Sequence, residues 1–146
     1  MKLTSTEFVD GGMIPARYTC DGEGISPPLN ISDVPAEAKT LVLLCDDPDA
    51  PMGVWDHWVV WNIPSATTEI PAGAHPGTEG MNSSPKRGYG PPCPPSGEHR
   101  YIFKLYALDD SLSLPGTATK AQAEQAMAGH ILAEVRFTGR YRRPGQ

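Results

Sequence analysis

Short apolar runs, some of them alternating with polar residues, recur along the chain and predict β-strands. Four segments show this pattern, at residues 40–45, 57–63, 101–108 and 131–141. The first is a continuous apolar run ended by Asp46, Asp47 and Pro48, which is typical of a buried strand. The second has apolar side chains on both faces, whereas the last alternates apolar with charged residues, as a half-exposed strand does.

One helix is predicted near the C-terminus. Thr119 is a suitable N-cap, and Gln122 is placed to complete a capping box. Alanines at positions 121, 123, 126 and 128 favour the helical state, and Gly129 is a suitable stop. Strands separated by long loops, with one late helix, predict an antiparallel β-sandwich. The chain shows no repeat or linker that would divide it, so a single domain over residues 1–146 is expected.

Composition and charge narrow the classes of function. Sixteen prolines and fifteen glycines indicate many turns and loops. A net charge of −5 argues against non-specific binding of nucleic acid and against attraction to anionic membranes. No apolar run approaches the roughly 20 residues of a membrane-spanning helix, and the N-terminal residues are too polar for a signal peptide. We therefore expect a cytoplasmic protein without stable membrane insertion.

The chain has three cysteines, Cys20, Cys45 and Cys93, which we expect to be reduced, with one disulfide as the alternative. An odd number of cysteines without a secretion signal favours reduced thiols. Cys20 and Cys93 both lie in loop-like sequence close to glycine or proline, so a disulfide between these two is the alternative.

Two proline-rich segments that lead to a histidine are the most informative feature of the chain. The first runs Asp47-Pro48-Asp49-Ala50-Pro51 and continues to Trp55-Asp56-His57-Trp58, and the second runs from Gly90-Pro91-Pro92 through a proline cluster to His99-Arg100-Tyr101. Because proline fixes φ and lacks a backbone donor, both segments are expected to form stiff loops. Stiff loops that end in histidine and tyrosine suit a preformed ligand pocket.

Together these segments resemble the phosphatidylethanolamine-binding protein family, which includes the Raf kinase inhibitor proteins. The short bacterial and archaeal branch is the best match, since the chain also has the stretches Tyr18-Thr19-Cys20-Asp21-Gly22 and Ser26-Pro27-Pro28-Leu29. The likeness covers about residues 14–141. It implies two antiparallel sheets with Greek-key-like connections and a pocket at one end. It assigns eight residues to that pocket: Asp47, Pro51, Trp55, His57, Gly90, Pro91, His99 and Tyr101.

The resemblance implies that the pocket binds small anions such as phosphate, and phosphorylated head groups including phosphoethanolamine. Chemistry supports this independently, since two imidazoles, a phenol and loop N–H groups supply the donors that phosphate oxygens need. A carboxylate such as Asp47 favours protonated histidine but repels an anion, so we expect it to face a histidine or a cationic amine. Trp55 would offer that amine an apolar or cation–π wall.

Several of these residues also have a structural interpretation. A single histidine beside a strand usually has a structural role, and Asp47 before Pro48 forms a common turn pair. Strand alternation directs Arg100 away from the pocket, where an ion pair with Asp47 or Asp49 is expected. Core positions are expected for tryptophans that do not line the pocket, among Trp58 and Trp61, and surface positions are expected for His75 and His130.

Binding of a small phosphorylated or anionic ligand, without catalysis, is the preferred function. Modulation of a protein partner such as a kinase is an extension that the resemblance implies. The sequence has no nucleophile elbow, P-loop or zinc-helix motif, and we expect no cofactor and no resident metal. The alternative is a metal-dependent hydrolase in which Asp47 or Asp49 joins His57 and His99. A protease inhibitor is a weaker alternative, because no inhibitory loop is recognisable.

The C-terminal part of the chain differs from the eukaryotic branch of the family. Residues 131–141 and an Arg/Pro/Gly tail stand where that branch has a helix that closes the pocket. The difference implies a more open pocket. It also predicts an exposed strand edge that a homodimer would bury.

Overall fold

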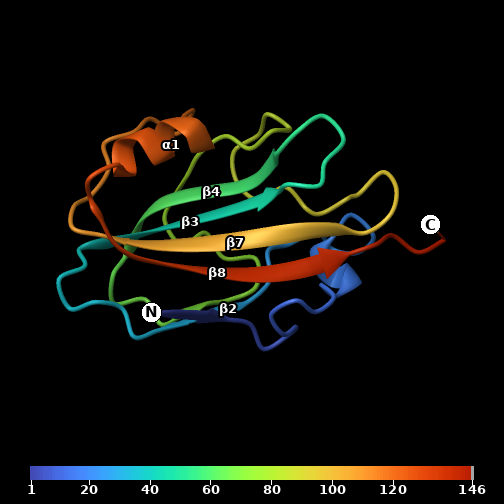
Figure 1. Ribbon diagram of the computed structural model, residues 1–146, viewed down its shortest axis with the longest axis horizontal. Helices are drawn as coiled ribbons and strands as arrows, with labels where there is room; N and C mark the ends of the chain where they lie inside the picture. Colours follow the sequence, from blue (N-terminus) through green and yellow to red (C-terminus); the bar gives the residue numbers. More distant parts are fainter. Residues whose placement is uncertain (146) are drawn as a thin grey trace.

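The computed structural model describes residues 1–145 and is built mainly of β-strands in two antiparallel sheets, as predicted (Figure 1). One sheet has the order β1-β2-β5 and the other the order β6-β4-β3-β7-β8. A 3-10 helix, η1, spans Ala16–Tyr18, and the α-helix α1 spans Lys120–Met127. The strands are β1 Lys2–Thr4, β2 Leu29–Ser32, β3 Thr40–Asp47, β4 Trp55–Pro64, β5 Glu69–Ile70, β6 Thr78–Glu79, β7 His99–Leu108 and β8 Ile131–Tyr141.

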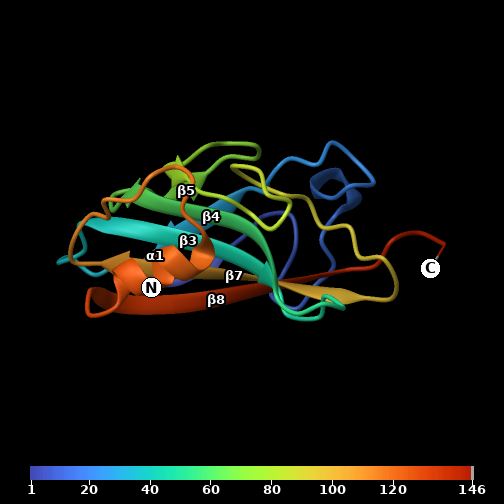
Figure 2. The ribbon, with the colours of Figure 1, turned by 90° about the horizontal axis from the view of Figure 1, so that it is seen from above.

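Two apolar cores cover the two faces of the five-stranded sheet, which explains why most of β3 is buried on both sides. The larger core lies between the sheets and includes Leu43 and Trp58. The helix α1 lies against the other face of this sheet (Figure 2). The smaller core lies under α1 and includes Val42, Trp61 and Met127. Trp58 and Trp61 therefore point to opposite faces of β4 and are core residues, as their spacing predicts.

The helix begins and ends as predicted. The Oγ1 atom of Thr119 accepts a hydrogen bond from the N–H of Gln122, and the Oε1 atom of Gln122 accepts one from the N–H of Thr119. These two bonds are the capping box. Gly129 follows the helix with a φ of 84°, a left-handed conformation that favours glycine. Within residues 1–145, no helix is long and apolar enough to cross a membrane.

The central strands match the sequence prediction, and three of them extend further towards the proline-rich loops. β3 continues to Asp47, β4 begins at Trp55 and β7 begins at His99. Because β3 is antiparallel to both neighbours, its end lies beside the beginnings of β4 and β7. This arrangement brings Asp47, Trp55 and His99 to one end of the sheet. Strands β1, β2, β5 and β6 were not predicted, because segments of two to four residues are too short to show periodicity.

The structure corrects the expectation of reduced thiols. Cys20 and Cys93 form a disulfide, whereas Cys45 is free and buried in the larger core. The loop after η1 packs against the proline-rich segment, where the N–H of Cys20 donates to the carbonyl of Pro92 at 3.1 Å. The odd count misled the prediction because one of the three cysteines is a core residue that has no role in pairing.

Candidate functional site

A cavity of about 390 Å³ opens at the end of the five-stranded sheet where the two proline-rich loops meet. Strand ends supply its floor, and the loops after β3 and before β7 supply its walls. Of the eight residues that the sequence assigns to a pocket, all but Gly90 line this cavity. The full lining is Asp47, Ala50, Pro51, Met52, Trp55, His57, Ser84, Pro91, Cys93, Pro94, Pro95, His99 and Tyr101.

Asp47 and His99 form a buried pair in the floor of the cavity. The Nδ1 atom of His99 lies 2.6 Å from the Oδ2 atom of Asp47, and both side chains are less than one-tenth exposed. The other carboxylate oxygen of Asp47 accepts the N–H of Asp49 at 2.7 Å, which fixes the turn that follows β3. Because an ionised carboxylate only accepts hydrogen bonds, the Nδ1 of His99 carries the hydrogen and its Nε2 is left for another partner. Asp47 thus faces a histidine, as the repulsion argument predicts.

His57 is held by a reciprocal pair of bonds to Gly90. Its Nδ1 donates to the carbonyl of Gly90 at 2.7 Å, and the N–H of Gly90 donates to the carbonyl of His57 at 2.7 Å. Gly90 therefore does not line the cavity but orients a residue that does. Burial lowers the pKa of His57 below its ordinary value, although the Gly90 bond and the nearby Asp47 charge act in the opposite direction. At neutral pH its Nε2 is consequently an acceptor, and protonation would convert it into a donor.

The hydroxyl of Tyr101 is the one buried polar group in this floor that has no hydrogen-bond partner among residues 1–145. The Tyr101 ring meets the His57 ring edge-on, with 5.2 Å between the ring centroids. Burial raises the pKa of Tyr101 far above its ordinary value, so the side chain stays a neutral phenol that can donate. Buried polar groups in native proteins are almost always hydrogen-bonded. A water or a ligand oxygen in the cavity would supply the missing partner.

The mouth of the cavity is apolar. Met52 is 97% exposed and Trp55 is 40% exposed, and the lining also contains Pro51, Pro95 and the buried Pro94. The sequence prediction included Pro51 and Trp55 but missed the other three, together with Ala50, Ser84 and Cys93. Five of the six lie within the two proline-rich segments, whereas Ser84 lies in the loop between β6 and the second segment. The motifs drew attention to these loops, but they could not show which loop residues face the cavity.

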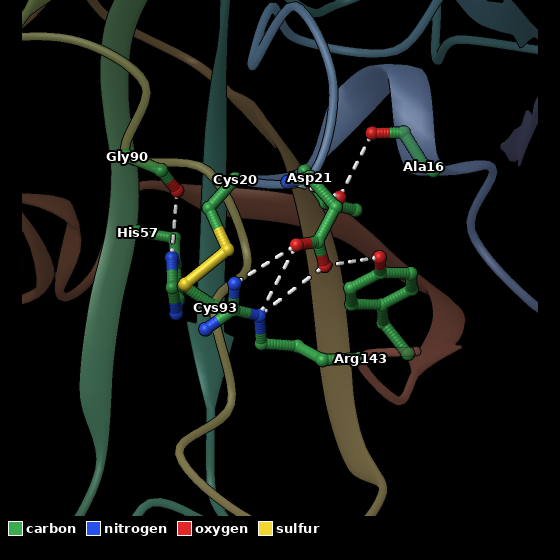
Figure 3. Close-up of a disulfide and its surroundings, with 9 residues drawn as sticks. Ala16, Cys20, Asp21, His57, Gly90, Cys93 and Arg143 are labelled. Carbon is green, nitrogen blue, oxygen red and sulfur yellow. Dashed lines mark hydrogen bonds and ion pairs between the residues drawn. A yellow bond between two sulfur atoms is a disulfide. The ribbon is translucent and has the colours of Figure 1, made fainter. Parts of the chain in front are cut away.

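The disulfide ties one wall of the cavity to the N-terminal and C-terminal parts of the chain. Cys93 lines the cavity, and its bond to Cys20 places the loop after η1 behind this wall (Figure 3). Next to Cys20, Asp21 pairs with Arg143 at 2.9 Å and accepts a hydrogen bond from the Tyr141 hydroxyl at 2.6 Å. Hydrogen bonds from Arg143 and Tyr141 lower the pKa of Asp21. The wall is thus fixed by covalent and polar contacts that the motifs do not reveal.

The remaining charged groups near the site are paired away from the cavity. Asp49 accepts three hydrogen bonds from Arg100, each at 2.9 Å, and these bonds lower its pKa. The prediction that Arg100 forms an ion pair here is confirmed for Asp49. On the opposite face of the sheet, buried Asp46 contacts Lys104 at 2.8 Å and Lys120 at 3.1 Å. Among residues 1–145, no three potential ligands are grouped so that they could hold a metal ion.

The histidines outside the motifs occupy the positions expected of them. His75 is largely exposed and contacts Glu79 at 2.6 Å, and His130 is about half exposed and contacts Asp109 at 2.8 Å. Neither residue lines the cavity.

Comparisons with known proteins agree with this architecture. The family model for phosphatidylethanolamine-binding proteins matches residues 4–142. The chain is 53% identical over 150 residues to a UPF0098 protein of Methanothermobacter thermautotrophicus, with coverage of 98% of this chain and 99% of that protein. It is 47% identical to a UPF0098 protein of Chlamydia trachomatis over 97% of this chain and 98% of that protein.

Two solved structures share the fold. One is described as a phosphatidylethanolamine-binding protein homologue from Chlamydia trachomatis, with a TM-score of 0.94, 46% identity and coverage of 97% of this chain and 96% of that chain. The other is YbcL of E. coli, described as a new member of the mammalian family, with a TM-score of 0.90, 28% identity and coverage of 97% and 98%. The chain belongs to the phosphatidylethanolamine-binding protein family.

Proposed function

We propose that this protein is a non-catalytic binding protein whose cavity takes a small phosphorylated ligand or another tetrahedral oxyanion. The observation that carries the proposal is the unpaired, buried hydroxyl of Tyr101 in a floor that also presents the imidazoles of His57 and His99. Family membership supports a binding protein over a metal-dependent hydrolase. Modulation of a protein partner such as a kinase stays a prediction from the resemblance.

The donors of the site depend on protonation. Tyr101 donates at any pH near neutrality, whereas the Nε2 of His57 becomes a donor only when the ring takes up a proton. A bound phosphate would favour the charged imidazole, because an opposite charge within about 4–6 Å stabilises the charged form. Alternatively, a phosphate that retains a proton would donate to neutral His57. Both states let an anion bind in a cavity whose lining contains no lysine or arginine.

The apolar mouth suggests how the rest of the ligand lies. Trp55 and Met52 both line the cavity and are both exposed to solvent. A cationic amine attached to the phosphate would meet an aromatic face there. Phosphoethanolamine is therefore expected to bind more tightly than inorganic phosphate.

The test is isothermal titration with phosphate and with O-phosphoethanolamine on the wild type and on Tyr101→Phe. Loss of a donor to a charged ligand costs about 1.5–3 kcal/mol, so affinity is expected to fall by roughly 10- to 100-fold. The free protein should not be destabilised, because the hydroxyl has no partner to lose. Tyr106→Phe is the matched control, since Tyr106 is buried in the other core. A folded wild type that binds neither ligand, or equal affinity in Tyr101→Phe, would contradict the proposal.

A further inference from the structure

The cavity wall formed by residues 91–98, which we call the proline loop, depends on contacts with the rest of the chain. Four of these residues are proline, which has no backbone N–H to donate. The loop contains neither helix nor strand. Near its middle, the carbonyl of Pro92 accepts the N–H of Cys20 at 3.1 Å, and Cys93 forms the disulfide with Cys20. The disulfide and the adjacent hydrogen bond therefore hold the middle of this wall against the loop after η1.

The other side of the disulfide is fixed by contacts of its own. Thr19 is buried, and its hydroxyl donates to a carbonyl of η1 at 2.8 Å. On the other side of Cys20, Asp21 is held by Arg143 and by the hydroxyl of Tyr141 (Figure 3). These contacts do not involve the sulfur atoms. Breaking the disulfide would therefore leave Cys20 in place and release the proline loop.

The two cysteines of the disulfide differ in accessibility. Cys93 is exposed and lines the cavity, whereas Cys20 is half-buried. A thiolate has to reach the sulfur that it attacks, so an incoming thiol would meet Cys93 first. Neither cysteine belongs to an apolar core, in contrast to the free Cys45. Both cores can therefore persist when the disulfide is broken.

We propose that Cys93 is a thiol-exchange site and that the Cys20–Cys93 disulfide is a redox-controlled clasp on the ligand cavity. This inference rests on the ligand binding proposed above. With the clasp closed, Pro91, Cys93, Pro94 and Pro95 are held in the positions in which they line the cavity. With the clasp open, the proline loop has to be ordered again when a ligand binds. That cost weakens the affinity of the reduced protein for its anion.

The exchange needs a dithiol as reductant. One thiolate of the reductant attacks the Sγ atom of Cys93 and forms a mixed disulfide with it. The Cys20 sulfur leaves with the electron pair of the broken bond and takes up a proton. The second thiolate of the reductant then attacks the reductant sulfur of the mixed disulfide, so that Cys93 is released and also takes up a proton. The reductant ends as a disulfide, and the protein has gained two electrons and two protons.

Ligand binding and redox state are linked in both directions. We expect reduction to weaken binding about tenfold, because the prolines still restrict the released loop while the floor of the cavity stays in place. A saturating ligand must then make reduction less favourable by the same factor, since coupling between two sites is reciprocal. For a two-electron couple, a tenfold factor lowers the midpoint potential by about 30 mV. A bound ligand thus protects the clasp from reduction.

Titration of O-phosphoethanolamine into oxidised and reduced protein tests the clasp. The dissociation constant should rise about tenfold when the wild type is reduced with dithiothreitol, an uncharged dithiol. Cys20→Ser/Cys93→Ser should bind as weakly as the reduced wild type and should not respond to the reductant. Asp46→Asn is the control for a general loss of stability, because Asp46 pairs with Lys104 on the opposite face of the sheet. This variant keeps the disulfide and should bind like the oxidised wild type.

Cysteine labelling gives a readout that needs no ligand. In the reduced protein, iodoacetamide should label Cys20 and Cys93 but spare Cys45, which is 1% exposed. Partial exchange with glutathione, trapped by alkylation of the freed thiol, should place the mixed disulfide on Cys93. Labelling of Cys45 would overturn the proposal, because the reduced protein would then be unfolded and not merely opened. Glutathione found mainly on Cys20 would overturn the assignment of the exchange site.

The titrations separate the clasp from the proposed function. Equal affinity of the oxidised and the fully reduced wild type would overturn the clasp and leave the proposed function intact. Tighter binding by the reduced protein would overturn it as well. An oxidised wild type that is folded but binds no phosphoethanolamine or phosphate would overturn the proposed function, and the clasp with it.

Discussion

Removal of the Cys20–Cys93 disulfide should be the most destabilising change at the cavity wall. The perturbation is the double variant Cys20→Ser/Cys93→Ser. The bond joins residues 73 positions apart, and the chain-entropy relation for a closed loop of that length gives about 4.4 kcal/mol at about 25 °C. Measured losses for native disulfides in small domains are typically about 2–5 kcal/mol. Since a small domain is stable by only about 5–15 kcal/mol, the loss is a large fraction of the whole.

Urea unfolding followed by tryptophan fluorescence measures this loss. The double variant should unfold at a lower midpoint than the oxidised wild type. The slope of the free energy of unfolding against urea should also rise, because the unfolded chain without the cross-link exposes more surface. Wild type treated with a dithiol reductant should match the double variant, and the double variant should not respond to the reductant. Equal midpoints for the oxidised wild type and the double variant would refute the reasoning.

Two further predictions concern charge. Affinity for sulfate, which does not itself titrate in this range, should rise by at most about tenfold per pH unit as the pH falls from about 8 to about 5. The reason is that a bound anion favours protonated His57, while burial holds the pKa of His57 below its ordinary value. Titration calorimetry in two buffers should detect the proton uptake, and a pH-independent affinity would exclude His57 as the coupled group. Asp46→Asn should lower the free energy of unfolding by roughly 3 kcal/mol, because it leaves Lys104 without its buried partner and Lys120 with Asp56 alone. Phosphate affinity should not change, and a parallel loss of binding would show that the two faces of the sheet are coupled.

The main elements of the fold could be predicted because each one satisfies a simple physical requirement. β3, most of β4 and the last four residues of β7 are buried on both faces, so these stretches are apolar in continuous runs. β8 is half exposed and alternates, and α1 carries its own cap. The smaller strands could not be predicted in this way. They consist of two to four residues whose pairing depends on partners far away in the sequence.

The candidate site could be predicted only in outline. The histidines, Tyr101 and the first proline-rich turn were found because motifs mark them, and the structure brings them to one cavity. Met52, Pro94 and Pro95 were missed because their orientation depends on how two loops pack against each other. The support of the wall was missed for the same reason, since Cys20 and Cys93 meet only after η1 has packed against the second loop.

The acidic residues at the end of β3 show why the proposed anion site is compatible with an acidic chain and a lining without lysine or arginine. Asp46 and Asp47 are adjacent, but strand alternation sends Asp46 to the lysines on the α1 side and Asp47 to His99 in the cavity. Asp49 lies in the turn beyond the strand and is paired with Arg100. Each carboxylate near the cavity is therefore matched by a basic group, and little unpaired negative charge faces an incoming ligand. Because no fixed cation lines the floor, we expect positive charge for an anion to come from a proton on the imidazole of His57. Affinity should then follow pH and the proton content of the ligand more closely than it follows ionic strength, since a buried pocket is screened by salt much less than a surface site is.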